Sequence, residues 1–425
     1  MIRIVKAGSA ALERFNARPA FPEEAEKAAA AVLAEIRCDG DRAVRKYAAK
    51  FEGWKGGGLR VEARIEDLEK KIDAKTRRAV LEAHRAVERF AKASLRKNWS
   101  IRTPGGGKSG EFFTPMDRVG VYVPGGTAPL ASTSIHTVTL AKTAGVAEIA
   151  ACTPGGKTGE VDPVLLYALL VAGATEIYRV GGIQAVGMMA FGTKSCRKVQ
   201  MIAGPGNAYV TAAKRQVFGY VAIDQVAGPS EIAVLADGSC PAAWVAADLL
   251  SQAEHGSGLE KSLCVCLSRD YALAVKAEVL RQAKSLSRRT LVERVIARGG
   301  IMVALAKSAG EALDAVNRFA PEHLELMAKN AMRFLKGVRA AGAVFVGPWT
   351  PESAGDFVAG PSHVLPTGGA ATMFGGLVPD AFRRRHSFVA FTEKDLRATR
   401  KSIETFATIE GLDAHGRAAG IRFAK

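Results

Sequence analysis

The chain has 425 residues, of which 48% are hydrophobic, and a formal net charge of +17. This length exceeds what one ordinary hydrophobic core organises, so we expect two or more domains. No run approaches the roughly 18 to 20 apolar residues of a membrane-spanning helix, and residues 1–6 do not begin a secretory signal. We therefore expect a cytoplasmic protein that does not enter a membrane.

The basic charge keeps nucleic-acid binding open as an alternative class of function. However, the charge is spread along the chain, and its densest run, Arg383–Arg385, has no interleaved aromatic residues on which bases could stack. We interpret the charge as a solvated basic surface and predict no nucleic-acid partner.

The six cysteines show no C-x-x-C pairing, which is typical of reduced intracellular thiols. Cys152 sits at the end of an apolar run before a glycine turn, where a nucleophilic thiol could take part in aldehyde oxidation. No base lies beside it in sequence, and we favour a packing role.

In chain order, the first hundred residues predict helices. Val44, Tyr47, Ala48 and Phe51 follow the i, i+3, i+4, i+7 spacing of an amphipathic helix. Loops are predicted at 56–58 and 104–107, which are rich in glycine.

From Asp117 onward, short apolar runs alternate with helical stretches, and each run ends in a Gly- or Pro-rich turn. This pattern predicts a parallel α/β sheet, whose ligands bind at the carboxyl ends of the strands. The first four predicted strands are Val119–Val123, Glu148–Cys152, Glu176–Val180 and Lys198–Ile202, and a second sheet is predicted from Ile232–Ala236, Leu263–Leu267, Met302–Leu305 and Ala343–Val346. We expect two α/β lobes with a cleft between them.

A last amphipathic helix is predicted from Thr392, a suitable N-cap, to Glu410, with Gly411 as its stop. Its apolar stripe has to be buried somewhere. A partner subunit is one such place, although the sequence alone does not choose it.

Four polar, turn-rich segments hold four of the seven histidines, and this clustering suggests a site. Gln252 and His255 are three residues apart at the end of a predicted helix, where unpaired carbonyls and the helix dipole favour a cation. The alternative for this segment is a polar helix end with a surface histidine. The four segments are Ser251–Gly256, Ala320–Leu324, Gly355–Thr367 and Glu410–His415.

These segments resemble the histidinol dehydrogenase family, NAD-linked enzymes of histidine biosynthesis. The resemblance extends to four further motifs, at Asp117–Leu130, Gly181–Ala185, Ala203–Val210 and Ala227–Glu231. It implies oxidation of L-histidinol through L-histidinal to L-histidine by two hydride transfers to NAD. The sequence differs from the family pattern at 256–261 and at Ser362. An alternative is therefore a paralogue that oxidises another amino alcohol or a diol.

The resemblance also implies roles for individual residues. His323 is the general base, and Glu322 activates the water that hydrates the aldehyde. One zinc ion per subunit, with Mn²⁺ as a possible substitute, is held by Gln252, His255, Asp356 and His415. NAD binds at Tyr122, Gln184 and Asn207. The substrate is bound by Ser230, Gln252, His255, His323, Asp356, Glu410 and His415. His363 lies near the substrate in the family, or is a structural loop residue.

The implied architecture has two Rossmann-like parallel-sheet lobes, a helical N-terminal region, and a C-terminal helical tail that is exchanged in a homodimer with shared active sites. We expect an N-terminal arm of residues 1–20 and a first lobe of 21–120 and 232–378 with metal and substrate residues. Residues 121–231 then form an inserted second lobe on the NAD side, and residues 379–425 form the dimerisation tail.

Overall fold

The computed structural model describes residues 1–18, 21–54, 56–125, 130–155 and 159–424. Residues 126–129 of the motif at 117–130, and residues 19–20 of the predicted arm, lie outside the described residues. The chain forms two compact units, the first from residues 1–94 and 117–382 and the second from residues 95–116 and 383–425. Among the described residues, no helix has both the length and the apolar composition needed to cross a membrane.

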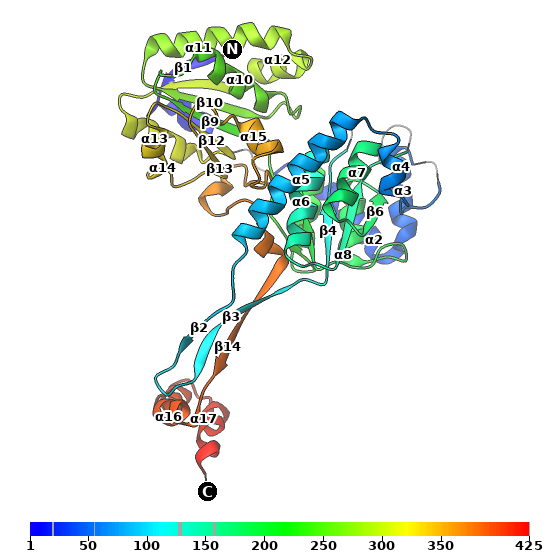
Figure 1. The fold of residues 1–425 in the computed structure, drawn as a ribbon, viewed down its shortest axis with the longest axis vertical. Coiled ribbons are helices and arrows are strands. Elements are labelled where there is room, and N and C mark those ends of the chain that lie inside the picture. The colour runs from blue at the N-terminus through cyan, green and yellow to red at the C-terminus, as the bar shows by residue number, and fades with distance from the viewer. Residues whose placement is uncertain (19–20, 55, 126–129, 156–158, 425) are drawn as a thin grey trace. The chain divides into compact units, whose positions relative to one another are not determined.

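The first unit contains a six-stranded parallel sheet (Figure 1), whose four inner strands are almost entirely buried and whose two edge strands are partly exposed. Its order is β1 (Arg3–Lys6), β11 (Ile301–Leu305), β10 (Lys261–Cys266), β9 (Glu231–Ala236), β12 (His323–Met327) and β13 (Ala343–Val346). One face packs against α10 (Ala242–Ala253), α11 (Arg269–Gln282), η1 (Ala283–Ser285) and α12 (Arg289–Ala297). The other packs against α1 (Ala10–Asn16), α13 (Ala309–Phe319) and α14 (Ala331–Leu335). After β13 come α15 (Glu352–Phe357), η2 (Ala370–Thr372) and η3 (Pro379–Phe382).

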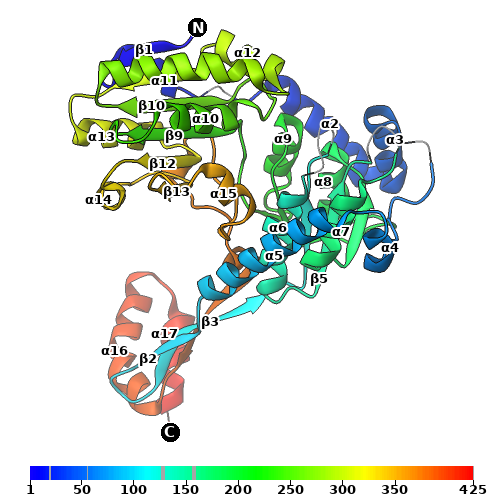
Figure 2. The same cartoon turned by 45° about the horizontal axis from the view of Figure 1, so that its top comes forward.

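The same unit contains a five-stranded parallel sheet (Figure 2). Its order is β6 (Glu176–Arg179), β5 (Glu148–Thr153), β4 (Arg118–Tyr122), β7 (Met201–Ala203) and β8 (Ala222–Ile223). The connecting helices are α6 (Ala131–Thr143), α7 (Pro163–Ala172), α8 (Gly182–Phe191) and α9 (Ala208–Val217). The two sheets confirm the predicted pair of parallel α/β lobes.

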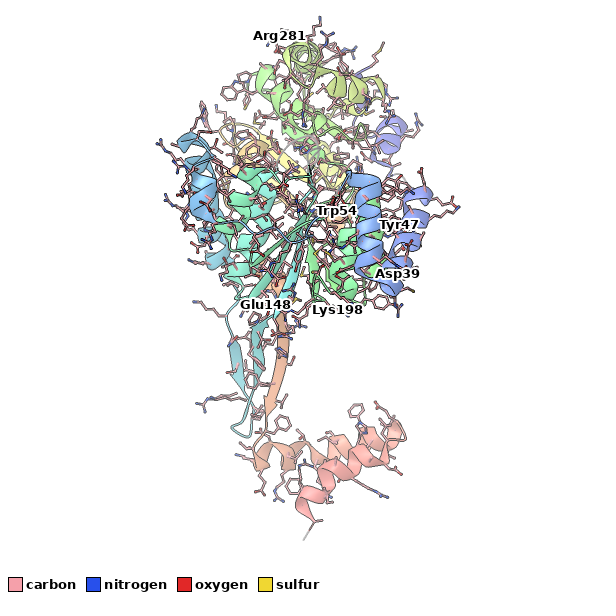
Figure 3. All side chains as sticks on the ribbon, turned by 90° about the vertical axis from the view of Figure 1, so that its right-hand side faces the viewer. Asp39, Tyr47, Trp54, Glu148, Lys198 and Arg281 are labelled. Carbon is pink, nitrogen blue, oxygen red and sulfur yellow. The ribbon has the colours of Figure 1, made fainter. Side chains whose placement is uncertain are left out.

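An ionic cluster marks the edge where the strands of the five-stranded sheet begin. Arg118 lies 2.8 Å from Glu148 and 2.6 Å from Glu176, and its side chain is almost fully buried. Glu148 and Lys198 are seen at this edge in Figure 3. The ligand-binding edge of such a sheet is the opposite one, where the strands end.

The N-terminal helices pack against the five-stranded sheet's own helices. These are α2 (Glu23–Asp39), α3 (Asp41–Glu52), α4 (Ile65–Glu69) and α5 (Ala74–Ser94). Helix α2 contacts α8 and α9, α3 contacts α8, and α4 and α5 contact α6 or α7. This packing differs from the predicted boundaries, which grouped residues 21–120 with 232–378. Its physical basis is close apolar contact: Gly187 of α8 has no side chain, and an added Cβ would lie 2.8 Å from Ile36 of α2.

The second unit is a three-stranded antiparallel sheet with two helices. The sheet order is β14 (Arg383–Ala390), β3 (Lys108–Pro115) and β2 (Trp99–Arg102), followed by α16 (Glu393–Ile409), α17 (Asp413–Gly420) and η4 (Ile421–Phe423). Thr392 caps α16 as predicted, in a reciprocal arrangement with Asp395. The Asp395 carboxylate also accepts hydrogen bonds from the backbone N–H groups of Gly105 and Gly107, at 2.6 and 3.1 Å. Exchange of this unit between subunits stays a prediction.

Candidate active site

His323 is the first residue of β12, which lies between β9 and the edge strand β13, and is 2% exposed. Its Nδ1 lies 3.2 Å from the backbone oxygen of Glu231 on the neighbouring strand. Because a carbonyl oxygen only accepts, Nδ1 must carry a proton. Nε2 then faces Asp356 Oδ1 at 3.5 Å and Glu352 Oε1 at 3.9 Å. The turn-rich segment Ala320–Leu324 thus runs into a strand.

A sharp turn leads into β12. Helix α13 is followed by Ala320, whose φ of 49° lies in the left-handed region and is the one such value among the described non-glycine residues. Such a backbone costs roughly 1–2 kcal/mol for a residue with a Cβ. The turn places Pro321 and Glu322 directly before His323.

The carboxylate of Glu322 is also buried. Its Oε2 accepts a hydrogen bond of 3.0 Å from the N–H of Glu231 and lies 3.7 Å from His323 Nδ1. Burial raises the pKa of Glu322 to about 8. Burial alone would lower the pKa of His323, but the carboxylates of Glu322, Asp356 and Glu352 outweigh it and raise that pKa to about 10.

Gln252 stands out as a buried amide without partners. It lies on α10, its side chain is fully buried, and neither its oxygen nor its nitrogen has a hydrogen-bond partner among the described residues. An unpaired buried amide is unfavourable, so the Gln252 side chain is available to coordinate a ligand. The predicted position of His255 is on the same last turn. Helix α10 ends at Ala253, however, and the exposed His255 lies in the turn that follows.

Asp356 and Glu352 lie one turn apart on the short helix α15. Burial by itself would raise the pKa of Asp356, but the nearby His323 holds it below the ordinary value. Ligand atoms of His255, Glu352 and Asp356 all lie within 4.8 Å of one another, a spacing suited to a metal ion. Gly355 allows this placement, since a side chain there would collide with the Phe345 ring beneath it.

Glu352 was not singled out from the sequence. It is 3% exposed, and its Oε2 accepts a hydrogen bond of 2.9 Å from the hydroxyl of Ser251, the residue before Gln252. Its backbone N–H donates to Glu325 Oε1 at 2.6 Å. Glu325, inside β12, is thus the residue that fixes the start of α15. The four-residue spacing between Glu352 and Asp356 is the one signal that could have indicated Glu352.

His363 lies in the loop after α15. Its Nδ1 is 3.0 Å from the backbone oxygen of Asp356, and its ring stacks on that of His136 with centroids 4.4 Å apart. His136, fully buried on α6, accepts a hydrogen bond from the His363 N–H. His363 therefore supports the Asp356 backbone and links the elements of the two sheets.

Two of the predicted NAD residues lie together at the carboxyl edge of the five-stranded sheet. Tyr122 ends β4, and its hydroxyl oxygen accepts from the N–H of Gly182 at 3.1 Å. Gln184, on the first turn of α8, donates to Glu52 Oε1 at 2.5 Å. Glu52 also accepts from the Gly181 N–H at 2.9 Å, so it is a supporting residue that the sequence analysis missed.

Asn207 is the N-cap of α9, after β7. Its side-chain oxygen accepts from the N–H groups of Tyr209 and Val210 at 3.0 and 3.1 Å. The preceding turn approaches Tyr122 so closely that Gly204, with φ of 116°, admits no side chain.

Burial raises the pKa of the nearby Cys152 thiol well above its ordinary value, which does not favour a nucleophilic thiolate.

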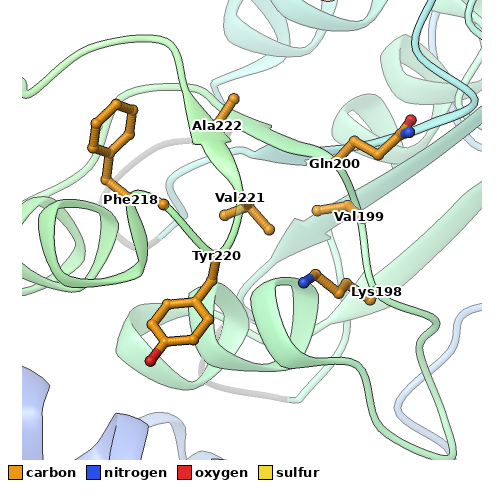
Figure 4. Close-up of a pocket in the computed structure, with 8 residues that line it drawn as sticks. Lys198, Val199, Gln200, Phe218, Tyr220, Val221 and Ala222 are labelled. Atoms are coloured by element: carbon orange, nitrogen blue, oxygen red, sulfur yellow. The ribbon is translucent and has the colours of Figure 1, made fainter. Parts of the chain in front are cut away.

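The remaining predicted substrate residues lie in two places. Ser230 directly precedes β9, next to Glu231. Glu410 and His415 are exposed residues of the second unit, where they line a pocket together with Phe406 and Leu412. A separate surface pocket at the edge strand β8 involves none of the predicted site residues (Figure 4) and is lined by Lys198, Val199, Gln200, Phe218, Gly219, Tyr220, Val221 and Ala222.

Comparison with known proteins identifies the family. The histidinol dehydrogenase family model matches residues 17–423. A histidinol dehydrogenase of Oceanobacillus iheyensis is 40% identical over 392 residues, covering 92% of this chain and 91% of that protein. One of Heliobacterium mobile is 42% identical over 399 residues, covering 93% of each. The chain belongs to the histidinol dehydrogenase family.

Solved structures agree with this membership. A crystal structure of a histidinol dehydrogenase from Elizabethkingia anophelis matches with a TM-score of 0.94 and 32% identity, over 100% of this chain and 98% of that one. The predicted family resemblance and the α/β fold with parallel sheets are therefore confirmed, while exchange of the C-terminal tail in a dimer stays a prediction. A member of this dehydrogenase family is an oxidoreductase.

Proposed function

We propose that this protein oxidises L-histidinol to L-histidine through L-histidinal, with two molecules of NAD⁺, as the last steps of histidine biosynthesis. The observation that carries the proposal is the buried pair Glu322 and His323 beside Asp356 and the unpartnered Gln252, in a chain of the histidinol dehydrogenase family. We expect the enzyme to act in the cytoplasm, without a nucleic-acid partner.

His323 serves the alcohol oxidation as general base. The hydroxyl proton moves to its Nε2 while the C–H bond of the carbinol carbon breaks and the carbonyl forms. The hydrogen bond from Nδ1 to Glu231 orients the ring so that Nε2 is the nitrogen available for this proton. NAD⁺, held by Tyr122, Gln184 and Asn207, supplies the hydride acceptor when bound.

Glu322 serves the aldehyde oxidation. Its carboxylate takes a proton from water as the water oxygen bonds to the aldehyde carbon. The carbonyl oxygen takes up the proton that His323 received in the first oxidation, which gives the hydrate and leaves His323 able to accept a proton again. Loss of a second hydride from that carbon and a proton from a hydroxyl group then forms the carboxylic acid, with His323 again receiving the proton. The hydrogen bond from the Glu231 N–H orients this carboxylate.

The donor set fits a divalent metal ion. Gln252 offers a buried amide oxygen without a partner, His255 an imidazole nitrogen and Asp356 a carboxylate, and mixed N and O donors suit Zn²⁺, with Mn²⁺ as a substitute. When bound, such an ion supplies positive charge that fixes the substrate's nitrogen atoms and offsets the carboxylates around His323.

The proposal includes a homodimer in which His415 and Glu410 serve the site of the other subunit. In the second unit several large apolar side chains are exposed, among them Phe406 at 64% and Ile409 at 73%. An exposed apolar surface of this kind is typical of a subunit interface.

The test is product analysis of the purified protein with L-histidinol, NAD⁺ and zinc. We expect two NADH, measured by absorbance, for each L-histidine found by chromatography. Absence of L-histidine would contradict the proposal, and a screen of other amino alcohols and of diols would then test the paralogue.

A further inference from the structure

One residue of β9 holds both members of the catalytic pair. The N–H of Glu231 donates to Glu322 Oε2 at 3.0 Å, and its carbonyl oxygen accepts from His323 Nδ1 at 3.2 Å. The position of this single residue therefore sets the orientation of the carboxylate and of the imidazole together.

The side chain of Glu231 is anchored inside the protein. Its Oε1 pairs with Arg18 at 2.5 Å, and its Oε2 accepts from the Gly368 N–H at 3.2 Å. The side chain of Glu231 is 4% exposed and that of Arg18 is 20% exposed. Arg18 also donates to the Phe319 backbone oxygen at 2.5 Å, and its guanidinium lies 4.7 Å from the centre of the Phe319 ring.

The segment that carries Arg18 is itself fixed. Lys261 donates to the backbone oxygens of Phe15 and Ala17 at 2.5 and 2.6 Å. Lys261 is the first residue of β10 and lies directly opposite Glu231 in the sheet. The end of α1 is thus held against the starts of two neighbouring strands, and Arg18 leaves it at a defined place.

A stabilising role alone explains this arrangement poorly. Desolvation cancels much of the attraction within a buried ion pair, so such pairs are weak contributors to net stability. An effect on the position of the reactive groups would be much larger, because a displacement of about 1 Å in a reactive group can lower the rate on the order of a hundredfold. Both Glu322 and His323 form hydrogen bonds to the backbone of Glu231, which the ion pair with Arg18 holds in place.

We propose that Arg18 and Glu231 are positioning residues for the reaction, which hold the start of β9 where it orients Glu322 and His323. This inference rests on the roles proposed for those two residues. It gives residue 18, near the start of the chain, a part in a reaction centre formed by residues more than 300 positions later.

The experiment compares Arg18→Met with Arg118→Met as a matched control. Both changes remove an arginine that pairs with a carboxylate, with side chains 20% exposed for Arg18 and 6% for Arg118, but Arg118 lies at the edge of the other sheet where strands begin. We expect Arg18→Met to lower kcat about tenfold or more, with the KM for NAD⁺ and the zinc content unchanged. Arg118→Met is expected to lower Tm at least as much and to keep kcat. Arg18→Lys is expected to restore most of the lost rate.

If Arg18→Met does not fold, Glu231→Gln replaces it in the experiment, because this change preserves the side-chain volume. We expect the same loss of kcat. The proposal is overturned if these variants fold and keep kcat, or if Arg118→Met lowers kcat as much as Arg18→Met does.

A readout that needs no substrate separates this inference from the proposed function. In protein with ¹⁵N-labelled histidine, the Nδ1 signal of His323, assigned by His323→Asn, reports its hydrogen bond to Glu231. We expect the signal to shift in Arg18→Met and to stay in Arg118→Met; an unshifted signal in Arg18→Met would overturn the proposal. Failure of the wild-type protein to oxidise L-histidinol, with the shift present, contradicts the substrate and leaves the positioning role standing.

Discussion

The role proposed for Glu322 predicts that the rate of the second oxidation depends on pH. Burial raises the pKa of Glu322 to about 8, so the carboxylate that accepts a proton from water becomes more populated as pH rises through that value. We expect oxidation of added L-histidinal to accelerate between about pH 7 and pH 9, and Glu322→Gln to abolish this increase and slow the step about a hundredfold. NADH formation measured across this range tests it. A flat wild-type profile, or a defect confined to L-histidinol oxidation, would contradict the assigned role.

His255 and Asp356 are expected to be needed for metal binding. Either His255→Ala or Asp356→Ala removes one donor from a set in which Gln252 contributes a neutral oxygen only, so we expect loss of bound zinc and of nearly all turnover. Elemental analysis of each purified variant measures this. His84→Ala is the control, since His84 bonds to Thr139 in a helix pair and should leave zinc in place. Full occupancy in both variants would exclude these residues as ligands.

Some site residues could be predicted from the sequence and others could not. Gln252, His255, Glu322, His323 and Asp356 lie in short motifs, and the structure places them on adjoining elements. The roles of Glu231 and Glu352 arise from contacts with residues far along the chain, such as Arg18 and Ser251. Ordinary spacing rules describe neighbours on one helix or strand, so these contacts were not predictable.

At the scale of elements, Asn207 is the N-cap of α9 and also one of the residues that we propose to bind NAD. Asn207→Ala removes the acceptor for two backbone N–H groups, and we expect it to cost about 1 kcal/mol of stability and to raise the KM for NAD⁺. Ser308→Ala is a matched control at the N-cap of α13, which should cost similar stability without changing that KM. Thermal unfolding and initial rates measure both effects. An equal rise in KM for the control would show that loss of stability, and not the site, was responsible.

Most strands were predictable because they are apolar runs before glycine turns. The runs at 119–123, 148–152 and 176–180 match β4, β5 and β6, while β7 begins three residues later than predicted. Strand β12 was missed because it contains His323 and Glu325, two charged types that strands rarely bury. Here the Glu231 carbonyl oxygen accepts from His323 Nδ1, and the Glu352 N–H donates to Glu325 Oε1. Strand β1 has only four residues, and its partner β11 lies about 300 positions away, beyond any local pattern.

At the scale of the whole molecule, subunit mixing tests the shared site. If His415 serves the other subunit, a mixed dimer of His415→Ala and His255→Ala chains has one doubly altered site and one intact site. We expect activity to return toward half per mixed dimer once subunits exchange. Mass measurement or labelling verifies the exchange. No recovery in verified mixed dimers would assign His415 to its own subunit and leave the chemistry unaffected.

The second unit has a consequence for how the protein is made. Asp395 ties α16 to the hairpin turn at Gly105 and Gly107, and β14 pairs along the whole length of β3. During translation, residues 95–116 therefore leave the ribosome well before their partners, and the first unit's sequence is synthesised in between. Until β14 has been synthesised, the edge of β3 that pairs with it stays unpaired, and an unpaired strand edge can associate with other chains. This region should accordingly gain protection from proteolysis only after synthesis has passed residue 395.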